Sequence, residues 1–186
     1  MPRRIFLFDP PDRFVADAIG EPGRRTFYLQ ASRGPRTVSV VLEKTQVAAL
    51  VGQLATLLDI LRGRGVEVPT ATPDAVRDSE PLEVPVTEDF RGGTISLGWD
   101  GVNRTIVIDV YEVSDSDEPD EEAGESRESP DDTRDVLSLR VAPEGVLAFM
   151  DRAAQAVSAG RPPCPFCGEP LNPEGHLCAR RNGHVN

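Results

Sequence analysis

The chain has 186 residues, of which 39% are hydrophobic, and a formal net charge of −11. This length suits one medium-sized domain with appended segments, and it is sufficient to bury a hydrophobic core. No apolar run approaches the roughly 20 residues that a membrane-spanning helix requires, and the run at 5–8 is too short for a signal-peptide core. We therefore expect a cytoplasmic protein that does not insert into membranes.

The first segment of the chain carries a strand signal and a helix signal. Residues 3–8 include the apolar run Ile5-Phe6-Leu7-Phe8, which predicts a strand. Asp12 is suited to cap a short helix at 13–19, and Gly20 follows where such a helix would end.

A hairpin and a long helix are expected next. Residues 26–31 and 37–42 are rich in β-branched and aromatic residues, and they flank the turn Arg33-Gly34-Pro35-Arg36. Residues 44–62 show apolar side chains at three- and four-residue spacing, which predicts one apolar stripe on a helix. The members of this stripe are Val47, Leu50, Val51, Leu54, Leu57, Leu58 and Leu61.

The middle of the chain predicts a loop followed by a second hairpin. Residues 64–92 contain four prolines and little periodicity, so we expect a connecting loop, with an edge strand near 82–87. Strands at 94–99 and 104–113 are then predicted on either side of the turn Asp100-Gly101-Val102-Asn103.

Most of the negative charge lies in the segment that follows. Residues 112–135 hold twelve acidic residues and two arginines, so this segment alone carries −10 and the rest of the chain −1. Such a segment has little apolar surface to offset the entropy of ordering it. We interpret residues 114–135 as an acidic loop that acts as a spacer. Shielding of arginines in the same chain and mimicry of nucleic acid are the alternative roles.

A strand and a helix complete the body, residues 1–160. The strand is predicted at 136–141, and the helix begins at Pro143 and ends at Gly160. We therefore expect an α+β fold in which antiparallel sheet is covered by two helices.

The two halves of the body suggest an internal repeat. Residues 38–51 match 137–150 at a shift of 99, with apolar residues facing apolar residues at most of the matched positions. This match suggests tandem βββα units at 1–63 and 93–160. The alternative is a single antiparallel sheet with two helices and no relation between its halves.

The C-terminal tail, residues 161–186, carries the clearest chemical motif. Cys164-Pro165-Phe166-Cys167-Gly168 places two thiols three residues apart, a spacing that lets both reach one tetrahedral ion. In an extended segment, His176 lies on the same face as Cys178. We predict a zinc knuckle in which a structural zinc ion is bound by Cys164, Cys167, His176 and Cys178, with His184 as the alternative fourth ligand. A metal-free tail and a redox-active cysteine pair are the other interpretations of this motif.

The sequence offers little support for catalysis. The body has no histidine and no cysteine, and the chain has no phosphate-binding loop or nucleophile elbow. A carboxylate mechanism remains open through four acids near predicted strand ends and turns: Asp9, Asp89, Asp100 and Asp109. Acids at such positions usually cap turns or face solvent, so we assign no catalytic residue.

Arginines are concentrated near the N-terminus. The first 36 residues hold seven arginines against four acidic residues. Such a cluster favours contact with phosphate groups, although a solvated surface is the simpler interpretation. The candidates for contact with phosphate or a partner are Arg24, Arg25, Arg33, Arg36, Arg180 and Arg181.

Four stretches, at 8–14, 41–50, 97–100 and 160–168, resemble an uncharacterised actinobacterial family of proteins of about this length. They read Phe-Asp-Pro-Pro-Asp-Arg-Phe, Val-Leu-Glu-Lys-Thr-Gln-Val-Ala-Ala-Leu, Leu-Gly-Trp-Asp and Gly-Arg-Pro-Pro-Cys-Pro-Phe-Cys-Gly. The family looks like a domain of unknown function, so the resemblance implies no catalytic residue. The tail also resembles the first two-thirds of a zinc ribbon, with Arg181 where a ribbon would have its fourth cysteine.

From these features we expect a non-enzymatic adaptor or regulator. Its zinc-binding tail and an edge of its sheet would contact an unknown protein partner. Nucleic-acid binding through the arginines and the zinc knuckle is the alternative function. An enzyme with carboxylate chemistry is the second alternative.

Overall fold

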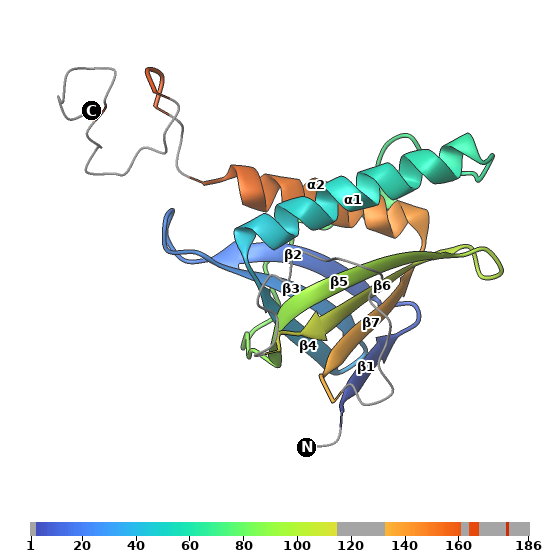
Figure 1. Cartoon of the computed structure of the whole chain (residues 1–186), viewed down its shortest axis with the longest axis horizontal. Coiled ribbons are helices and arrows are strands. Elements are labelled where there is room, and N and C mark those ends of the chain that lie inside the picture. The colour runs from blue at the N-terminus through green and yellow to red at the C-terminus, as the bar shows by residue number, and fades with distance from the viewer. Residues whose placement is uncertain (1–2, 115–132, 161–163, 168–177, 179–186) are drawn as a thin grey trace.

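The computed structural model describes residues 3–114, 133–160, 164–167 and 178. These residues form a two-layer α+β structure, in which two helices lie side by side over one face of a seven-stranded sheet (Figure 1). The strands are β1 (Ile5–Phe8), β2 (Arg13–Ile19), β3 (Thr26–Arg33), β4 (Arg36–Leu42), β5 (Phe90–Asp100), β6 (Thr105–Glu112) and β7 (Val136–Val141). The helices are α1 (Lys44–Gly63), the short 3-10 helix η1 (Asp74–Val76) and α2 (Pro143–Ser158). The expected α+β class is confirmed.

The sheet is mixed, with the strand order β1-β7-β6-β5-β4-β3-β2. Two antiparallel meanders, β2-β3-β4 and β5-β6-β7, meet where β4 pairs with β5 in parallel, and β1 pairs with β7 in parallel. The two parallel pairs depart from the purely antiparallel sheet that we expected. A parallel pair needs a long crossover, and α1 with the segment after it supplies one between β4 and β5.

The chain contains two βββα segments in succession, β2-β3-β4-α1 and β5-β6-β7-α2. The first of them differs from the prediction, because the segment at 13–19 is a strand and not a helix. All seven residues of β2 pair with β3, and the alternating residues Phe14 and Ala16 are buried in the core. Asp12 caps no helix; its carboxylate accepts a hydrogen bond from the Gly34 N–H in the β3–β4 turn at 2.8 Å.

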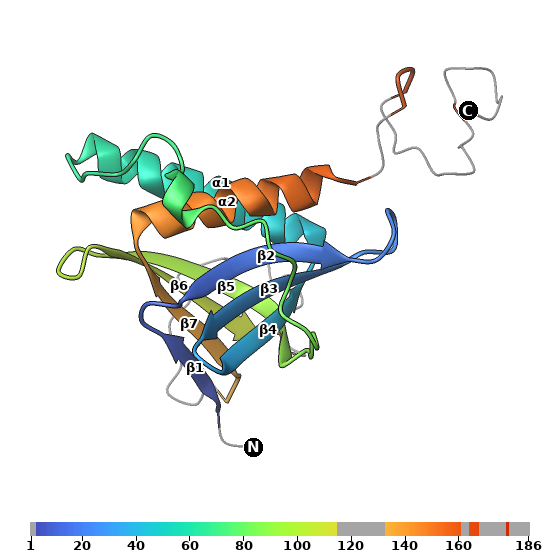
Figure 2. The same cartoon turned by 180° about the vertical axis from the view of Figure 1, so that it is seen from behind.

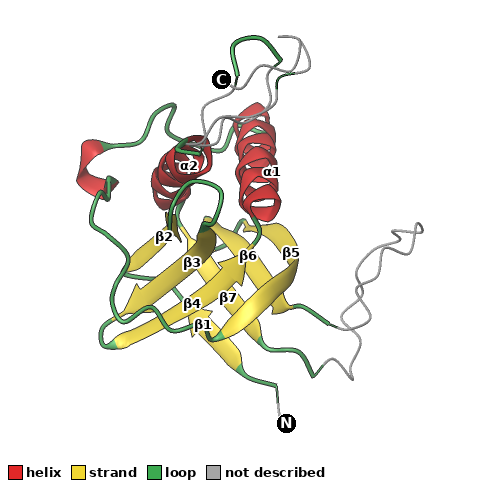
Figure 3. Cartoon of the chain, turned by 90° about the vertical axis from the view of Figure 1, so that its left-hand side faces the viewer, coloured by secondary structure: helices red, strands yellow, loops and turns green. Residues whose placement is uncertain are grey.

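The core lies between the sheet and the two long helices (Figure 3). The predicted stripe on α1 is confirmed, since five of its members are buried: Val47, Leu50, Leu54, Leu58 and Leu61. Helix α2 buries Val146, Phe149 and Ala153 beside it. Phe149 stacks on Phe14 of β2 with the ring centroids 4.1 Å apart, which fixes α2 over that edge of the sheet.

Residues 64–89, between α1 and β5, form a segment that we call the strap. It crosses the face of the first meander, β2-β3-β4, that is turned away from the two helices. Figure 2 shows it running from η1 past β2, β3 and β4. No strand forms near 82–87, where we expected one. Glu83 is held instead by side chains of β3 and β4: its carboxylate accepts hydrogen bonds from the hydroxyls of Ser32 (2.6 Å) and Thr37 (2.5 Å), and its N–H donates to the Gln30 amide oxygen (2.8 Å). Polar side chains on this face therefore bind the strap.

Within the predicted acidic loop, residues 115–132 lie outside the described part of the chain. At its end, Asp135 is buried and belongs to the fold. Its carboxylate accepts hydrogen bonds from the backbone N–H of Arg4 at 2.8 Å and from the Arg4 side chain at 2.6 Å. Asp135 therefore fastens the chain beside β1 and is not part of a passive spacer.

One glycine of β5 provides a test of core packing. A Cβ atom on Gly92 would lie 2.5 Å from Cδ2 of Leu42 and 3.0 Å from Cγ1 of Val110, and both of these side chains are buried. We expect Gly92→Ala to lower the free energy of unfolding by about 1–3 kcal/mol, because the core must move to admit the methyl group. Gly98→Ala is the control, since its Cβ would meet Val107 at an ordinary 3.7 Å. Urea unfolding measures both, and equal effects would contradict this account.

Candidate functional site

The tail brings its three cysteines together. The Sγ atoms of Cys164, Cys167 and Cys178 all lie within 4.8 Å of one another, and those of Cys164 and Cys178 are 3.9 Å apart. Cys164 and Cys178 are buried, and Cys167 is half-buried. Among the described residues, this is the one group of three or more potential ligands close enough to hold a metal ion.

The environment of Cys164 favours the thiolate, which is the form that binds metals. Burial of the thiol opposes ionisation. The backbone N–H groups of Cys167 and Phe166 and the thiols of Cys167 and Cys178 outweigh this effect, and together they lower the pKa of Cys164 to about 6. The Phe166 N–H donates to Cys164 Sγ at 3.4 Å, the kind of N–H to sulfur contact that a tight cysteine turn provides.

The structure describes only some of the other residues singled out in the sequence. His176 and His184, the candidate fourth ligands, lie outside the described residues, as do Arg180 and Arg181. The remaining four arginines fall into two pairs near opposite ends of β3: Arg24 and Arg25 just before it, and Arg33 and Arg36 around the β3–β4 turn. Arg36 lies over the rings of Phe6 and Phe8 at 5.5 and 5.2 Å from their centroids.

The four carboxylates considered for catalysis occupy separate places in the fold. Three of them accept hydrogen bonds there: Asp89 from the Ser39 N–H, Asp100 from Val102 and Asn103 in the β5–β6 turn, and Asp109 from the Ser138 hydroxyl. Asp9 is exposed on the turn between β1 and β2. Hydrogen bonds of this kind are typical of carboxylates that stabilise strands and turns.

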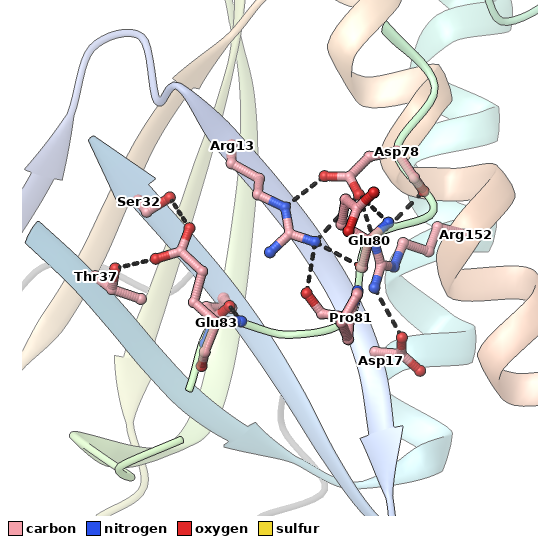
Figure 4. Close-up of polar contacts among 10 residues, drawn as sticks. Arg13, Asp17, Ser32, Thr37, Asp78, Glu80, Pro81, Glu83 and Arg152 are labelled. Carbon is pink, nitrogen blue, oxygen red and sulfur yellow. Dashed lines mark hydrogen bonds and ion pairs between the residues drawn. The ribbon is translucent and has the colours of Figure 1, made fainter. Parts of the chain in front are cut away.

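A chain of ion pairs that was not among the sequence-based predictions joins the strap to the body (Figure 4). Asp78 of the strap pairs with Arg13 of β2 and, at 2.8 Å, with Arg152 of α2. Arg152 also binds the Asp17 carboxylate of β2 at 2.8 Å, and its side chain is only 10% exposed. Because 65 to 135 residues of sequence separate the partners, no local pattern could have revealed them.

This network predicts a pH dependence of stability. The hydrogen bond from Arg13 lowers the pKa of Asp78; burial opposes it, and the Arg13 charge, the Glu80 N–H and the Arg152 charge add to it. A carboxyl group that is more acidic in the folded state stabilises the fold above its unfolded pKa of about 3.9. That contribution is lost as the pH falls through the folded pKa.

We therefore expect Asp78→Asn to lower the free energy of unfolding by about 1–3 kcal/mol at pH 7, and by less at pH 3. Urea unfolding at both pH values measures the difference. Asp59→Asn is the matched control, because Asp59 pairs with Arg62 on the surface of α1, where the change should be below about 1 kcal/mol. This account would be contradicted if Asp78→Asn lowered the free energy of unfolding by the same amount at pH 7 and at pH 3.

The fold and the tail together define a two-layer α+β protein with a C-terminal cysteine cluster that could hold a metal ion. The chain belongs to the family described as "Protein of unknown function (DUF3090)", whose sequence model matches residues 6–178. The match includes all three cysteines. Searches of curated proteins and of solved structures gave no match. No helix among the described residues is long and apolar enough to cross a membrane.

Proposed function

We propose that this protein is a zinc-binding adaptor or regulator that acts in the cytoplasm through contacts with another protein. The observation that carries the proposal is the convergence of three cysteine sulfurs within 4.8 Å. Zinc–sulfur bonds of about 2.3 Å place the sulfurs of a tetrahedral site about 3.8 Å apart. The 3.9 Å between the sulfurs of Cys164 and Cys178 fits this dimension. Thiolates also favour zinc over magnesium or calcium.

The proposed zinc site is structural and closed. With His176 as the fourth ligand, or His184 in its place, four nitrogen and sulfur ligands would fill the tetrahedron and leave no position for substrate. Such a site would stabilise the tail, which has few apolar residues of its own.

Two exposed apolar features support a protein partner. Phe166, inside the cysteine turn, is 48% exposed. Ile5 and Leu7 of β1 are 59% and 51% exposed, and β1 is the last strand at one end of the described sheet order. Apolar side chains at a sheet edge suit contact with another protein.

Binding of nucleic-acid phosphates would instead need arginines gathered on one surface. The four described candidate arginines lie in two pairs, near opposite ends of β3.

The test uses the full chain as bait in an extract of its native host, compared with Phe166→Ser, which keeps every proposed zinc ligand. Proteins retained by the natural chain and lost with Phe166→Ser are identified by mass spectrometry, purified, and titrated directly against the bait. We expect at least one of these proteins to bind the natural chain directly, and to bind Phe166→Ser at least about tenfold more weakly.

The same preparation is titrated with fluorescent RNA and DNA oligonucleotides at 50 and 200 mM salt. Nucleic-acid binding that weakens steeply with salt, without a direct protein partner, would replace the adaptor proposal with the nucleic-acid alternative. The absence of any direct protein partner would also contradict the proposal.

A further inference from the structure

A cleft of about 520 Å³ lies between α2, β2 and the strap. This volume is within the range of small-molecule sites in proteins. Alanines along α2 leave room on that wall, and charged and polar side chains form the rest. The lining includes Asp78 and Arg152 of the ion-pair network, together with Asp17, Thr72, Arg77, Ser79, Asp151 and Gln155.

The charged walls of the cleft are held in place. The ion pairs of Arg152 with Asp17 and Asp78 join α2 to β2 and to the strap, each at 2.8 Å. Thr72 is buried, and its hydroxyl donates to the Asp151 carboxylate at 2.6 Å, a second link between strap and α2. Side chains fixed in this way can bind a ligand with little further loss of conformational entropy.

The charges in the cleft do not balance. Arg152 is matched by Asp17 and Asp78, and Asp78 by Arg13 as well. Arg77 pairs with Asp74 at 3.3 Å. Within the part of the chain that the structure describes, Asp151 has no ion-pair partner, and its hydrogen bond comes from the neutral Thr72 hydroxyl. Asp151 is therefore a solvent-exposed carboxylate at the wall of the cleft that lacks a cationic partner among the described residues.

The lining does not favour a metal ion as that cation. Three carboxylates line the cleft, yet the described residues offer no group of three potential ligands at metal-binding distances apart from the cysteines. An organic ammonium group needs only one carboxylate and nearby hydrogen-bonding groups, which Ser79 and Gln155 supply.

We propose that this cleft binds a small hydroxylated organic amine, with the ammonium group on Asp151 and its hydroxyl groups facing Ser79 and Gln155. The amine donates to the Asp151 carboxylate oxygens in a charge-assisted hydrogen bond. The proposal concerns the α+β body and is independent of the proposed zinc site.

The test compares amines with neutral molecules of the same shape. The ¹⁵N-labelled full chain is titrated with glucosamine and glucose, and with ethanolamine and ethylene glycol, while amide NMR signals are followed. We expect each amine, and not its neutral counterpart, to shift the amides of residues 72–79 and 151–156. Because the acidic segment attracts cations generally, shifts are compared by position and not only by size.

Two variants separate the cleft from general cation binding. Asp151→Asn should abolish the shifts in the cleft, or raise the apparent Kd at least about tenfold. Glu67→Gln should leave them unchanged, since it removes an equally negative side chain that is 94% exposed outside the cleft. The proposal is overturned if neither amine shifts these residues beyond its neutral counterpart. It is equally overturned if Asp151→Asn, with an otherwise unchanged spectrum, responds like the natural chain.

Discussion

Purified, reduced protein is expected to contain about one zinc ion per chain, and Cys167→Ser is expected to contain none. The change removes one of three sulfurs that converge within 4.8 Å, and it leaves at most three ligands for an ion that structural sites hold with four. Elemental analysis of the purified chain gives the stoichiometry. Phe166→Ser is the control, because it alters the same turn and keeps all three thiols.

The two histidines should differ in this experiment. We expect His176→Ala to weaken zinc binding more than His184→Ala. The opposite order would make His184 the fourth ligand and keep the site. Reduced protein that carries no metal and takes up none on addition of zinc would contradict the site itself.

Removal of the metal should unfold the tail and leave the body folded. The core of the body is built from the sheet, α1 and α2, and Cys164, Cys167 and Cys178 take no part in it. Chelation should therefore leave the far-ultraviolet circular dichroism nearly unchanged, while the amide signals near the cysteines lose their dispersion. Collapse of the whole spectrum would show that the tail supports the body.

Leu54→Ala is expected to lower the free energy of unfolding by about 2–5 kcal/mol. Leu54 is fully buried in the middle of α1, so the change removes apolar contacts with the core and leaves a cavity. Urea unfolding followed by circular dichroism measures this loss. Ile60→Ala on the same helix is the matched control, because Ile60 is 46% exposed and should lose less than half as much. A near-neutral Leu54→Ala would mean that this stripe does not pack on the core.

Local sequence patterns predicted much of the fold. The stripe that includes Leu54 predicted α1 and its buried face, because the 3.6-residue period appears directly in the sequence. The helix predicted at 13–19 was wrong because the local signals there are ambiguous. Seven residues with Asp12 before and Gly20 after satisfy the end signals of a helix as well as a strand, and only pairing with β3 decides between them.

The two candidate sites also differ in how far the sequence alone reveals them. The cysteine motif is local, since two of its three members are three residues apart, and the structure brings Cys178 to them. The cleft depends on partners such as Thr72 and Asp151, which are 79 residues apart. Neither residue belongs to a motif, and such a site becomes visible only when the chain is folded.

The pairing of β1 with β7 has a consequence for synthesis of the chain. β1 leaves the ribosome before its partner strand β7, and the Arg4–Asp135 contact beside this pair spans 131 residues. At about 5–20 residues per second, β1 would wait roughly 7 to 26 s for its partner strand. Until then the apolar run Ile5-Phe6-Leu7-Phe8 has an unpaired backbone, the kind of edge that associates with other chains. During that interval β1 is therefore exposed to aggregation and to capture by chaperones.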